Sequence, residues 1–372
     1  MTAADVGVFP AGLPARFDGP NAWYGPEIAS RGDWIEILSG EELDEVATAA
    51  RPWLARVERD ARALNEMTVA DFRLPTLALR AARVTGELLR GRGFVLLRGL
   101  PVEQWGARLC AVAFYGLGLH IGVPRTQNAQ GHLLGHVRDL GLRSDDPNVR
   151  IYQTHERQTF HTDSADVVGL LCLQTAKQGG LSALVSSITL YNELRARRPD
   201  LARRLFSPFA TDRRGEVPPG EKPYFTIPVF NWHEGELSAI YQRQYIDSAQ
   251  RFADAPRLAG DDVAALDLLD ALADDPALHM TMTLERGDMQ FVHNHTLLHD
   301  RTAFEDHPEP ARRRHLLRLW LSPAGARPLP PVFAQRYGSV VPGARGGVGI
   351  AEDAGVMPLP EESIEDGSCE SR

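Results

Sequence analysis

The chain has 372 residues, of which 43% are hydrophobic and 24% are charged, a composition typical of a globular protein with a large core. Its formal net charge of −9 at pH 7 argues against a nucleic-acid partner, which would require a basic face. Because no apolar segment has the length of a membrane span or a signal peptide, we expect a cytoplasmic protein without membrane contact.

The first predicted elements follow an irregular N-terminal arm. Residues 1–35 are rich in Gly, Pro and aromatic side chains, which favours an arm that lies on the body of the protein. Ser39, which precedes two glutamates, is typical of the residue that caps a helix start. A second helix is predicted at Leu77–Arg90 and ends near Gly91, and the apolar residues 94–97 then predict a buried strand.

From about residue 133 onward, short apolar runs alternate with glycines and polar turns. This pattern predicts strands, which are expected at 167–173, 183–186, 223–241, 280–285, 289–293 and 314–321. Apolar residues at helical spacing predict two helices in the same part of the chain, at 188–206 and 261–273.

The only His-x-Asp triplet of the chain joins His161 and Asp163. Residues two apart in a strand point to the same side, so these two side chains can bind one metal ion. A third ligand must come from another strand, and His299 can supply it from far along the chain, with His293 and His295 as alternatives. Two histidines and one carboxylate leave the opposite metal positions open, which is the arrangement of non-haem Fe(II) oxygenases.

An arginine run follows this histidine. Arg314 and Arg318 are four residues apart, so in a strand they face the same side. A buried guanidinium is costly without a partner, and it binds a carboxylate through two parallel hydrogen bonds. We therefore expect Arg314 to bind the far carboxylate of an oxo acid that chelates the iron, with the Ser182 hydroxyl as a possible second donor. Arg312 and Arg313 remain alternatives to Arg314.

The candidate ligands lie on both sides of the region 188–273, so a domain boundary there would divide the site. The sequence therefore predicts one domain at residues 1–350 that is mainly β with flanking helices. The expected core is a double-stranded β-helix (jelly roll) that carries the N-terminal arm and a helical insert at about 188–273. Residues 351–372 are rich in acidic residues and predict a poorly ordered tail.

Five short segments appear in one order between about residues 90 and 325. They are Phe-His-Thr-Asp at 160–163, Gly-Gly-Leu-Ser at 179–182, Gly-Asp-Met-Gln-Phe at 287–291, Leu-His-x-Arg-Thr-Ala-Phe at 298–304 and Arg-Arg-His-Leu-Leu-Arg at 313–318. Together they resemble the taurine dioxygenase-like (TauD/TfdA) family of Fe(II)/2-oxoglutarate-dependent oxygenases.

The resemblance implies that His161, Asp163 and His299 are the iron ligands. It further implies that Arg314 binds the C5 carboxylate of 2-oxoglutarate, that Ser182 stands where the family often has Thr, and that Arg318 contacts substrate or co-substrate. Related halogenases lack the ligand carboxylate, so the presence of Asp163 disfavours halogenation.

The implied reaction uses Fe(II), 2-oxoglutarate and O2 to oxidise a small organic molecule, with release of succinate and CO2. Hydroxylation is the default outcome, and desaturation, cyclisation and C–heteroatom cleavage stay open. Two other classes are alternatives: a zinc hydrolase with three protein ligands, and a non-catalytic metal-binding protein of the same fold. Asn128, Tyr152 and Arg157 precede the His-x-Asp triplet and are weaker candidates for substrate contacts at the pocket mouth. The sequence leaves the substrate and the oligomeric state open.

Overall fold

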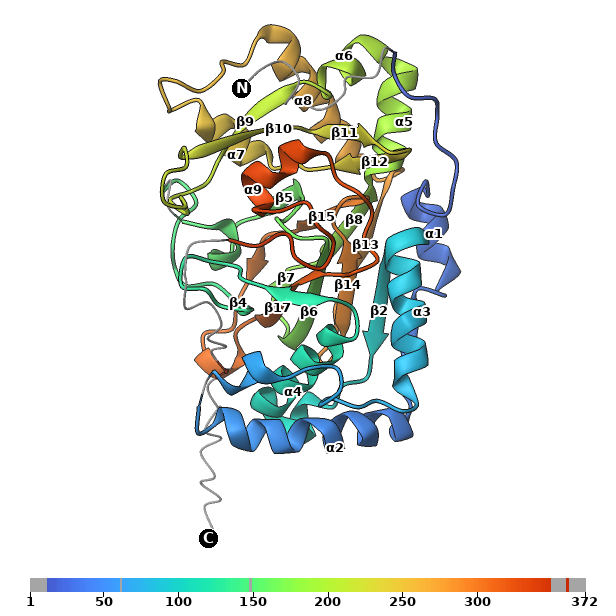
Figure 1. Ribbon diagram of the computed structural model, residues 1–372, viewed down its shortest axis with the longest axis vertical. Helices are drawn as coiled ribbons and strands as arrows, with labels where there is room; N and C mark the ends of the chain where they lie inside the picture. The colour runs from blue at the N-terminus through green and yellow to red at the C-terminus, as the bar shows by residue number, and fades with distance from the viewer. Residues whose placement is uncertain (1–11, 61, 147–148, 349–358, 361–372) are drawn as a thin grey trace.

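The structure is a computed structural model, and it describes residues 12–60, 62–146, 149–348 and 359–360 (Figure 1). The fold is mainly β with helices on the outside, as the sequence predicts. Apart from residues 359–360, the predicted acidic tail lies outside the described residues. Within the described part of the chain, no helix combines the length and apolar character that crossing a bilayer requires.

The larger sheet has seven strands. Its strands are β1 (Ile35–Ile37), β2 (Phe94–Arg98), β3 (Val123–Arg125), β4 (Leu134–Val137), β6 (Val167–Gln174), β14 (Met289–His293) and β17 (His315–Ser322). Their order is β1-β2-β14-β6-β17-β3, and β4 also pairs with β17. All pairs are antiparallel except β1 with β2.

The smaller sheet has four antiparallel strands in the order β13-β8-β15-β5. Their bounds are β5 (Gln158–His161), β8 (Ser182–Ser186), β13 (His279–Met282) and β15 (Leu297–Arg301). The pairing of β15 with β5 sets His299 directly opposite His161. Two short strands, β7 (Gln178–Gly179) and β16 (Phe304–Glu305), form a separate pair beside this sheet.

The two sheets pack face to face through a shared apolar cluster. Phe94, Val292 and Leu316 of the larger sheet contact this cluster from one side, and Leu184 and Leu297 of the smaller sheet contact it from the other. Because side chains alternate along a strand, neighbouring residues of β17 go to different layers. The residues after Leu316 therefore alternate between the outer helical layer and the space between the sheets.

Helices cover both outer faces (Figure 1). The larger sheet packs against α2 (Gly40–Val57), α3 (Leu77–Arg90) and α4 (Val102–Leu119). The smaller sheet packs against α5 (Ser187–Arg197), α6 (Pro199–Arg204) and α8 (Gly260–Ala273). Helix α4 is not predicted from the sequence. Residues 109–118 of α4 are buried without exception, so this stretch lacks the polar face that marks an amphipathic helix.

The region 188–273 combines helices with two β-hairpins. One hairpin pairs β9 (Pro208–Asp212) with β10 (Tyr224–Pro228), and the other pairs β11 (Phe230–His233) with β12 (Glu236–Ala239). The helix predicted at 188–206 is two helices, because Pro199 forces the preceding residue out of helical geometry and begins α6. Three short helices complete the fold: α1 (Gly25–Arg31), α7 (Arg243–Ala249) and α9 (Ala334–Tyr337).

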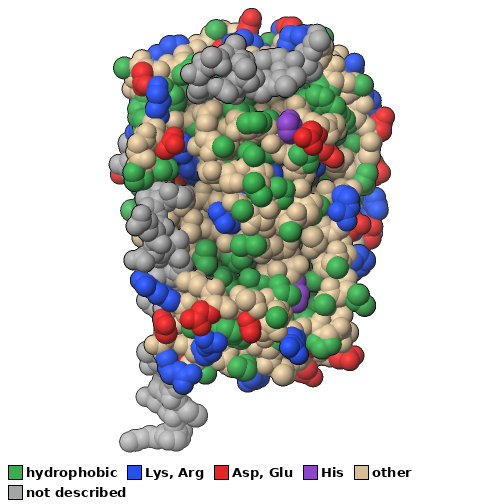
Figure 2. All heavy atoms as spheres, viewed as in Figure 1, with side chains coloured by type: hydrophobic (Ala, Val, Ile, Leu, Met, Phe, Trp, Pro, Cys, Tyr) green, Lys and Arg blue, Asp and Glu red, His purple; other side chains and the backbone are tan. Residues whose placement is uncertain are grey.

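Acidic and basic side chains are interspersed on the face drawn in Figure 2, and they do not gather into a basic patch on that face. This distribution agrees with the net charge of −9. It gives no support on that face for the electrostatic footprint of a nucleic-acid-binding protein.

The predicted start of α2 has a complete capping box. The Ser39 hydroxyl accepts a hydrogen bond from the Glu42 amide at 3.2 Å, and the Glu42 carboxylate accepts one from the Ser39 amide at 2.8 Å. Ser39→Ala removes the first bond, so we expect the free energy of unfolding to fall by about 1 kcal/mol. Urea denaturation followed by circular dichroism measures this change. Ser30→Ala, at an exposed serine of α1, should change it little; an equal loss in both variants contradicts the capping role.

Candidate active site

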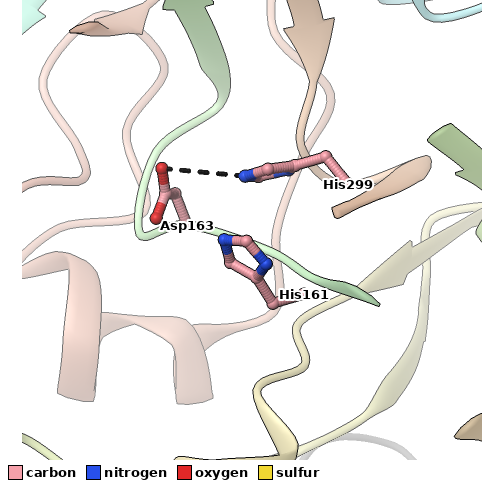
Figure 3. A group of neighbouring side chains, drawn as sticks. All are labelled: His161, Asp163 and His299. Carbon is pink, nitrogen blue, oxygen red and sulfur yellow. Dashed lines mark ion pairs between the residues drawn. The ribbon is translucent and has the colours of Figure 1, made fainter. Parts of the chain in front are cut away.

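Three potential metal ligands meet between the two sheets (Figure 3). His161 ends β5, Asp163 follows two residues later, and His299 lies in the middle of β15. One ligand atom from each side chain lies within 4.8 Å of the others, and no other such group of His, Cys, Asp or Glu occurs among the described residues. The antiparallel pairing of β5 with β15 accounts for this meeting of residues far apart in the sequence.

Both imidazoles are in the neutral form that a metal requires. The Nδ1–H of His161 donates a hydrogen bond to the backbone oxygen of Thr159 at 2.8 Å, so Nδ1 carries the proton of the neutral ring and Nε2 has a free lone pair. That Nε2 lies 2.9 Å from the Gln158 amide nitrogen, and a metal bound there would replace this hydrogen bond. Burial lowers the pKa of His161, and burial together with the neighbouring His161 lowers the pKa of His299 to about 3.

Asp163 is held as an ionised carboxylate. Its Oδ2 accepts hydrogen bonds from Arg318 at 3.1 Å and from the Trp320 indole at 2.9 Å. Burial alone would raise the pKa of Asp163, but the positive charge of Arg318, together with the hydrogen bond from Trp320, outweighs burial and holds this pKa below its usual range. The backbone amide of Asp163 donates to the Asn294 side chain at 2.9 Å, which fixes the turn after β5.

A first cavity opens beside these three residues, and we call it the Arg314 cavity. It is lined by the three potential ligands and by Tyr152, Ser182, Arg301, Arg314 and Arg318, among others. Arg314 is buried, and its Nη1 has no hydrogen-bond partner among the described residues. Burial lowers the pKa of Arg314 to about 10, so its side chain is still charged at neutral pH. A charged guanidinium with an unpartnered nitrogen in a cavity is suited to bind a carboxylate.

The other predicted arginines lie elsewhere. Arg312 is exposed and lies 3.7 Å from Glu309, and Arg313 donates to backbone oxygens of the same surface loop. Neither lines the Arg314 cavity. Of the three consecutive arginines, the structure therefore brings only Arg314 to the site.

Ser182 lies in the Arg314 cavity, but its hydroxyl already bonds to the Gln290 side chain at 3.1–3.2 Å. Arg301 also lines this cavity, and its Nε has no partner among the described residues. Burial and the nearby charge of Arg314 together lower the pKa of Arg301 to about 9. Sequence reasoning gave Arg301 no role, although this residue stands two positions after His299 in the quoted Leu-His-x-Arg segment.

Of the three weaker candidates for substrate contacts, only one lines the site. Tyr152 lines the site, and the Arg318 guanidinium lies 4.8 Å from the centre of its ring. Arg157 instead pairs with Asp300 at 2.7 Å on a partly exposed surface, and it lines neither the Arg314 cavity nor a second cavity that adjoins it. Asn128 hydrogen-bonds His132 across a turn and also lies outside both cavities.

The alternative metal ligands are buried apart from the triad. The Nε2 of His295 lies 2.9 Å from the carboxylate of Asp166, and the Nδ1 of His293 lies 2.8 Å from the Thr296 hydroxyl. Neither histidine belongs to the group that includes Asp163. The residue between them is Asn294, which binds the backbone of Asp163. Of this His-Asn-His segment, Asn294 therefore supports the turn that carries Asp163.

A second cavity, which we call the Arg336 cavity, adjoins the first. The two share His161, Asp163, Tyr152, Gln158 and Arg318. The second cavity extends away from His299 to a wall with apolar side chains and two further arginines, Arg150 and Arg336. The triad thus lies where two cavities meet.

The donor set fits Fe(II) with an oxo acid. Two neutral imidazoles and an ionised carboxylate leave metal positions open. The unpartnered nitrogen of Arg314 lies in the adjoining cavity, where it can bind the carboxylate of an oxo acid. A second cavity at the same centre provides room for a substrate. Fold and site together define a metal- and oxo-acid-dependent oxygenase.

Comparison with known proteins identifies the family. The family described as "Taurine catabolism dioxygenase TauD, TfdA family" matches residues 60–320, and the chain belongs to this family. The chain is 31% identical to FR-33289 synthase of Streptomyces rubellomurinus over 318 residues, which cover 84% of this chain and 92% of the relative. It is 29% identical to a uridine-5'-phosphate dioxygenase of Amycolatopsis sp. over 275 residues, which cover 70% of this chain and 93% of the relative.

Solved structures share the fold. Asparagine oxygenase in complex with Fe(II), 3-hydroxyasparagine and succinate has a TM-score of 0.57 at 18% identity, over 77% of this chain and 93% of that one. The non-haem iron oxygenase OrfP in complex with Fe and α-ketoglutaric acid has a TM-score of 0.55 at 17% identity, with the same coverage. With the family established, the protein is an Fe(II)/2-oxoglutarate-dependent dioxygenase.

The hydrogen bond from Trp320 orients the carboxylate of Asp163, so its loss should weaken metal binding. Residues that orient a metal ligand typically contribute about 10- to 100-fold to metal affinity. We expect Trp320→Phe to weaken Fe(II) binding by about tenfold, because the ring stays while the N–H donor is lost. Anaerobic competition with a chelator measures this affinity. Trp53→Phe, in the outer helical layer, is the matched control. Equal Fe(II) affinity in wild type and Trp320→Phe contradicts this role.

Proposed function

We propose that His161, Asp163 and His299 hold Fe(II) and that Arg314 binds the C5 carboxylate of 2-oxoglutarate. With O2, the loaded iron supplies the oxidant, and the enzyme hydroxylates a small organic molecule with release of succinate and CO2. The single observation that carries this proposal is the charged Arg314 side chain with an unpartnered nitrogen, in the cavity that the three ligands line.

Arg318 orients the proposed metal ligand Asp163 and balances its charge. Arg318 donates to the Asp163 carboxylate at 3.1 Å and also to Gln127 at 2.8 Å, so it fixes the ligand in one rotamer. Asp163 is in turn kept ionised, so the metal need not displace a proton from it. We therefore propose that Arg318 positions Asp163. The Arg318 guanidinium also contacts the ring of Tyr152, and both residues line both cavities.

Ser182 is proposed as a weaker contact to the co-substrate carboxylate. Its hydroxyl is engaged with Gln290, and a hydroxyl can accept one bond while it donates another. Arg301 lines the same cavity, where it is a second cation beside Arg314. Arg157 and Asn128, which have partners outside the cavities, are not retained as substrate contacts.

We further infer that the two facing sheets are the halves of a double-stranded β-helix, and that residues 1–350 form one domain. The histidine ligands lie in β5 and β15 of the smaller sheet, whereas Arg318, which binds Asp163, lies in β17 of the larger sheet. The site therefore needs both sheets. Product analysis decides between hydroxylation and desaturation, cyclisation or cleavage. A cytoplasmic location without a nucleic-acid or membrane partner stays a prediction of the sequence.

The triad assignment can be tested by spectroscopy without turnover. We expect the anaerobic protein with Fe(II) and 2-oxoglutarate to give a weak visible charge-transfer band, and His161→Ala, Asp163→Ala and His299→Ala to abolish it. His293→Ala and His295→Ala are matched controls that remove a nearby buried imidazole and should keep the band. If the band survives in His299→Ala and disappears in His293→Ala or His295→Ala, the assignment of His299 as the third ligand is contradicted.

The assignment of Arg314 predicts a separate change. Removal of one partner from a buried charged hydrogen bond costs a few kcal/mol, so Arg314→Gln should raise the 2-oxoglutarate concentration needed for half-maximal succinate formation by about 100-fold. Fe(II) binding should stay nearly intact, because Arg314 does not contact the triad. Arg312→Gln, at an exposed arginine two residues earlier, should leave the requirement unchanged. A large effect in Arg312→Gln with a near-wild-type Arg314→Gln contradicts the assignment.

A further inference from the structure

The Arg336 cavity carries positive charge that its own carboxylates do not balance. Two carboxylates line this cavity, and each already has an arginine partner: Asp163 pairs with Arg318 at 3.1 Å, and Asp212 pairs with Arg251 at 3.1 Å. Arg150 and Arg336 also line the cavity. The charge of these two arginines must therefore be balanced from elsewhere.

Arg150 and Arg336 share one carboxylate. Glu216 lies 2.7 Å from Arg150 and 3.8 Å from Arg336, and it is not among the residues that line the cavity. All three side chains are at most 10% exposed. Two buried guanidiniums with one carboxylate leave an excess of one positive charge at the cavity wall. Such an excess is costly unless an anion arrives to balance it.

The remaining contacts of Arg336 keep its guanidinium at the cavity. Its Nε donates to the Ser164 hydroxyl at 2.7 Å, one residue after Asp163. Burial lowers the pKa of Arg336 to about 10, and Glu216 only partly opposes this effect. The side chain is therefore charged at neutral pH, incompletely paired, and next to the residue that follows a proposed iron ligand.

The segment that carries Arg336 is tied to the site. Arg336 belongs to α9, which lies beyond the residues 60–320 that match the family. After α9, Gly347 donates to the Ser164 backbone at 2.7 Å, and Arg345 pairs with the buried Asp166 at 2.8 Å. This arrangement holds the C-terminal segment against the turn that carries Asp163, so Arg336 has a fixed place in the cavity wall.

One part of the cavity wall is apolar. It includes Phe225, Ile227, Val229, Ile240 and Ile246. A ligand that fits this wall has a carbon portion for the apolar side chains and one anionic end for the arginines. Guanidiniums bind planar and tetrahedral oxyanions alike, through paired N–H donors.

We propose that Arg150 and Arg336 form an oxyanion-binding subsite, and that the substrate is a small acid whose carboxylate, phosphonate, phosphate or sulfonate group binds there. The substrate class rests on the proposed function, but the subsite itself does not require iron. The alternative is that both arginines only stabilise the fold through Glu216 and Ser164.

Binding of simple anions to the metal-free protein tests the subsite directly. Inorganic phosphate and acetate are titrated by calorimetry into Arg314→Gln protein, in which the guanidinium proposed to bind 2-oxoglutarate is removed. We expect Arg150→Gln and Arg336→Gln, added separately, to weaken binding by about tenfold or more. The preference for phosphate or acetate separates tetrahedral from planar substrate groups.

Two further variants separate binding from a structural role. Glu216→Gln removes the competing carboxylate, so anion binding should become tighter, whereas a purely structural pair gives no gain. Arg92→Gln is the matched control, since Arg92 is a mostly buried, ion-paired arginine outside this cavity. Unchanged anion affinity in Arg150→Gln and Arg336→Gln overturns the proposal, as does the absence of phosphate and acetate binding to Arg314→Gln protein.

The charge-transfer band keeps the two proposals distinguishable. Neither Arg150 nor Arg336 lines the Arg314 cavity, so both variants should keep the Fe(II)/2-oxoglutarate band of the wild type. Small acids should then shift this band in wild type, their primary amides should not, and Arg336→Lys should restore part of the response lost in Arg336→Gln. Anion binding without any band refutes the iron site alone, and a band without anion binding refutes the subsite alone.

Discussion

Asp163 is a carboxylate buried between two sheets, and burial alone would raise its pKa. An isolated buried charge costs several kcal/mol, so the fold must supply partners or the group would be protonated. Arg318 and Trp320 supply them from β17, and Asn294 holds the backbone of Asp163 from the turn after β14. Both sheets thus converge on one side chain, and the alternation along β17 is what turns Arg318 and Trp320 toward it. A shift of β17 by one residue would turn both toward the helices and leave Asp163 without a cation.

The features that the sequence predicted are those that depend on local spacing. His161 and Asp163 are two residues apart at a strand end, so their common direction follows from strand geometry. The Ser39 cap and the bounds of α3 follow from short-range signals in the same way. The choice of His299 as the third ligand came from the resemblance to the TauD/TfdA family, because its place opposite His161 depends on a strand pairing that only the fold shows.

The features that the sequence did not predict depend on tertiary surroundings. Helix α4 is apolar almost all round because it packs between α2 and the larger sheet, so its periodicity carries no signal. Arg336 lies in a four-residue helix after the last motif, and no spacing links it to Arg150 or to Glu216. Arg157 and Asn128 were expected from chain position alone, and their partners in the fold lie away from the cavities.

The two cavities raise a problem that any enzyme with two acidic ligands must solve. In the proposed function, 2-oxoglutarate and an acidic substrate approach one metal centre, and each could enter the other's place. The cations that would select between them lie apart: Arg314 lines only one cavity, and Arg150 and Arg336 line only the other. The arginine common to both cavities is Arg318, and its charge is already engaged by Asp163. Because the shared middle is neutralised while the two ends are not, the C5 carboxylate of 2-oxoglutarate and the anionic group of the substrate each gain most at opposite ends of the two cavities, away from the shared centre.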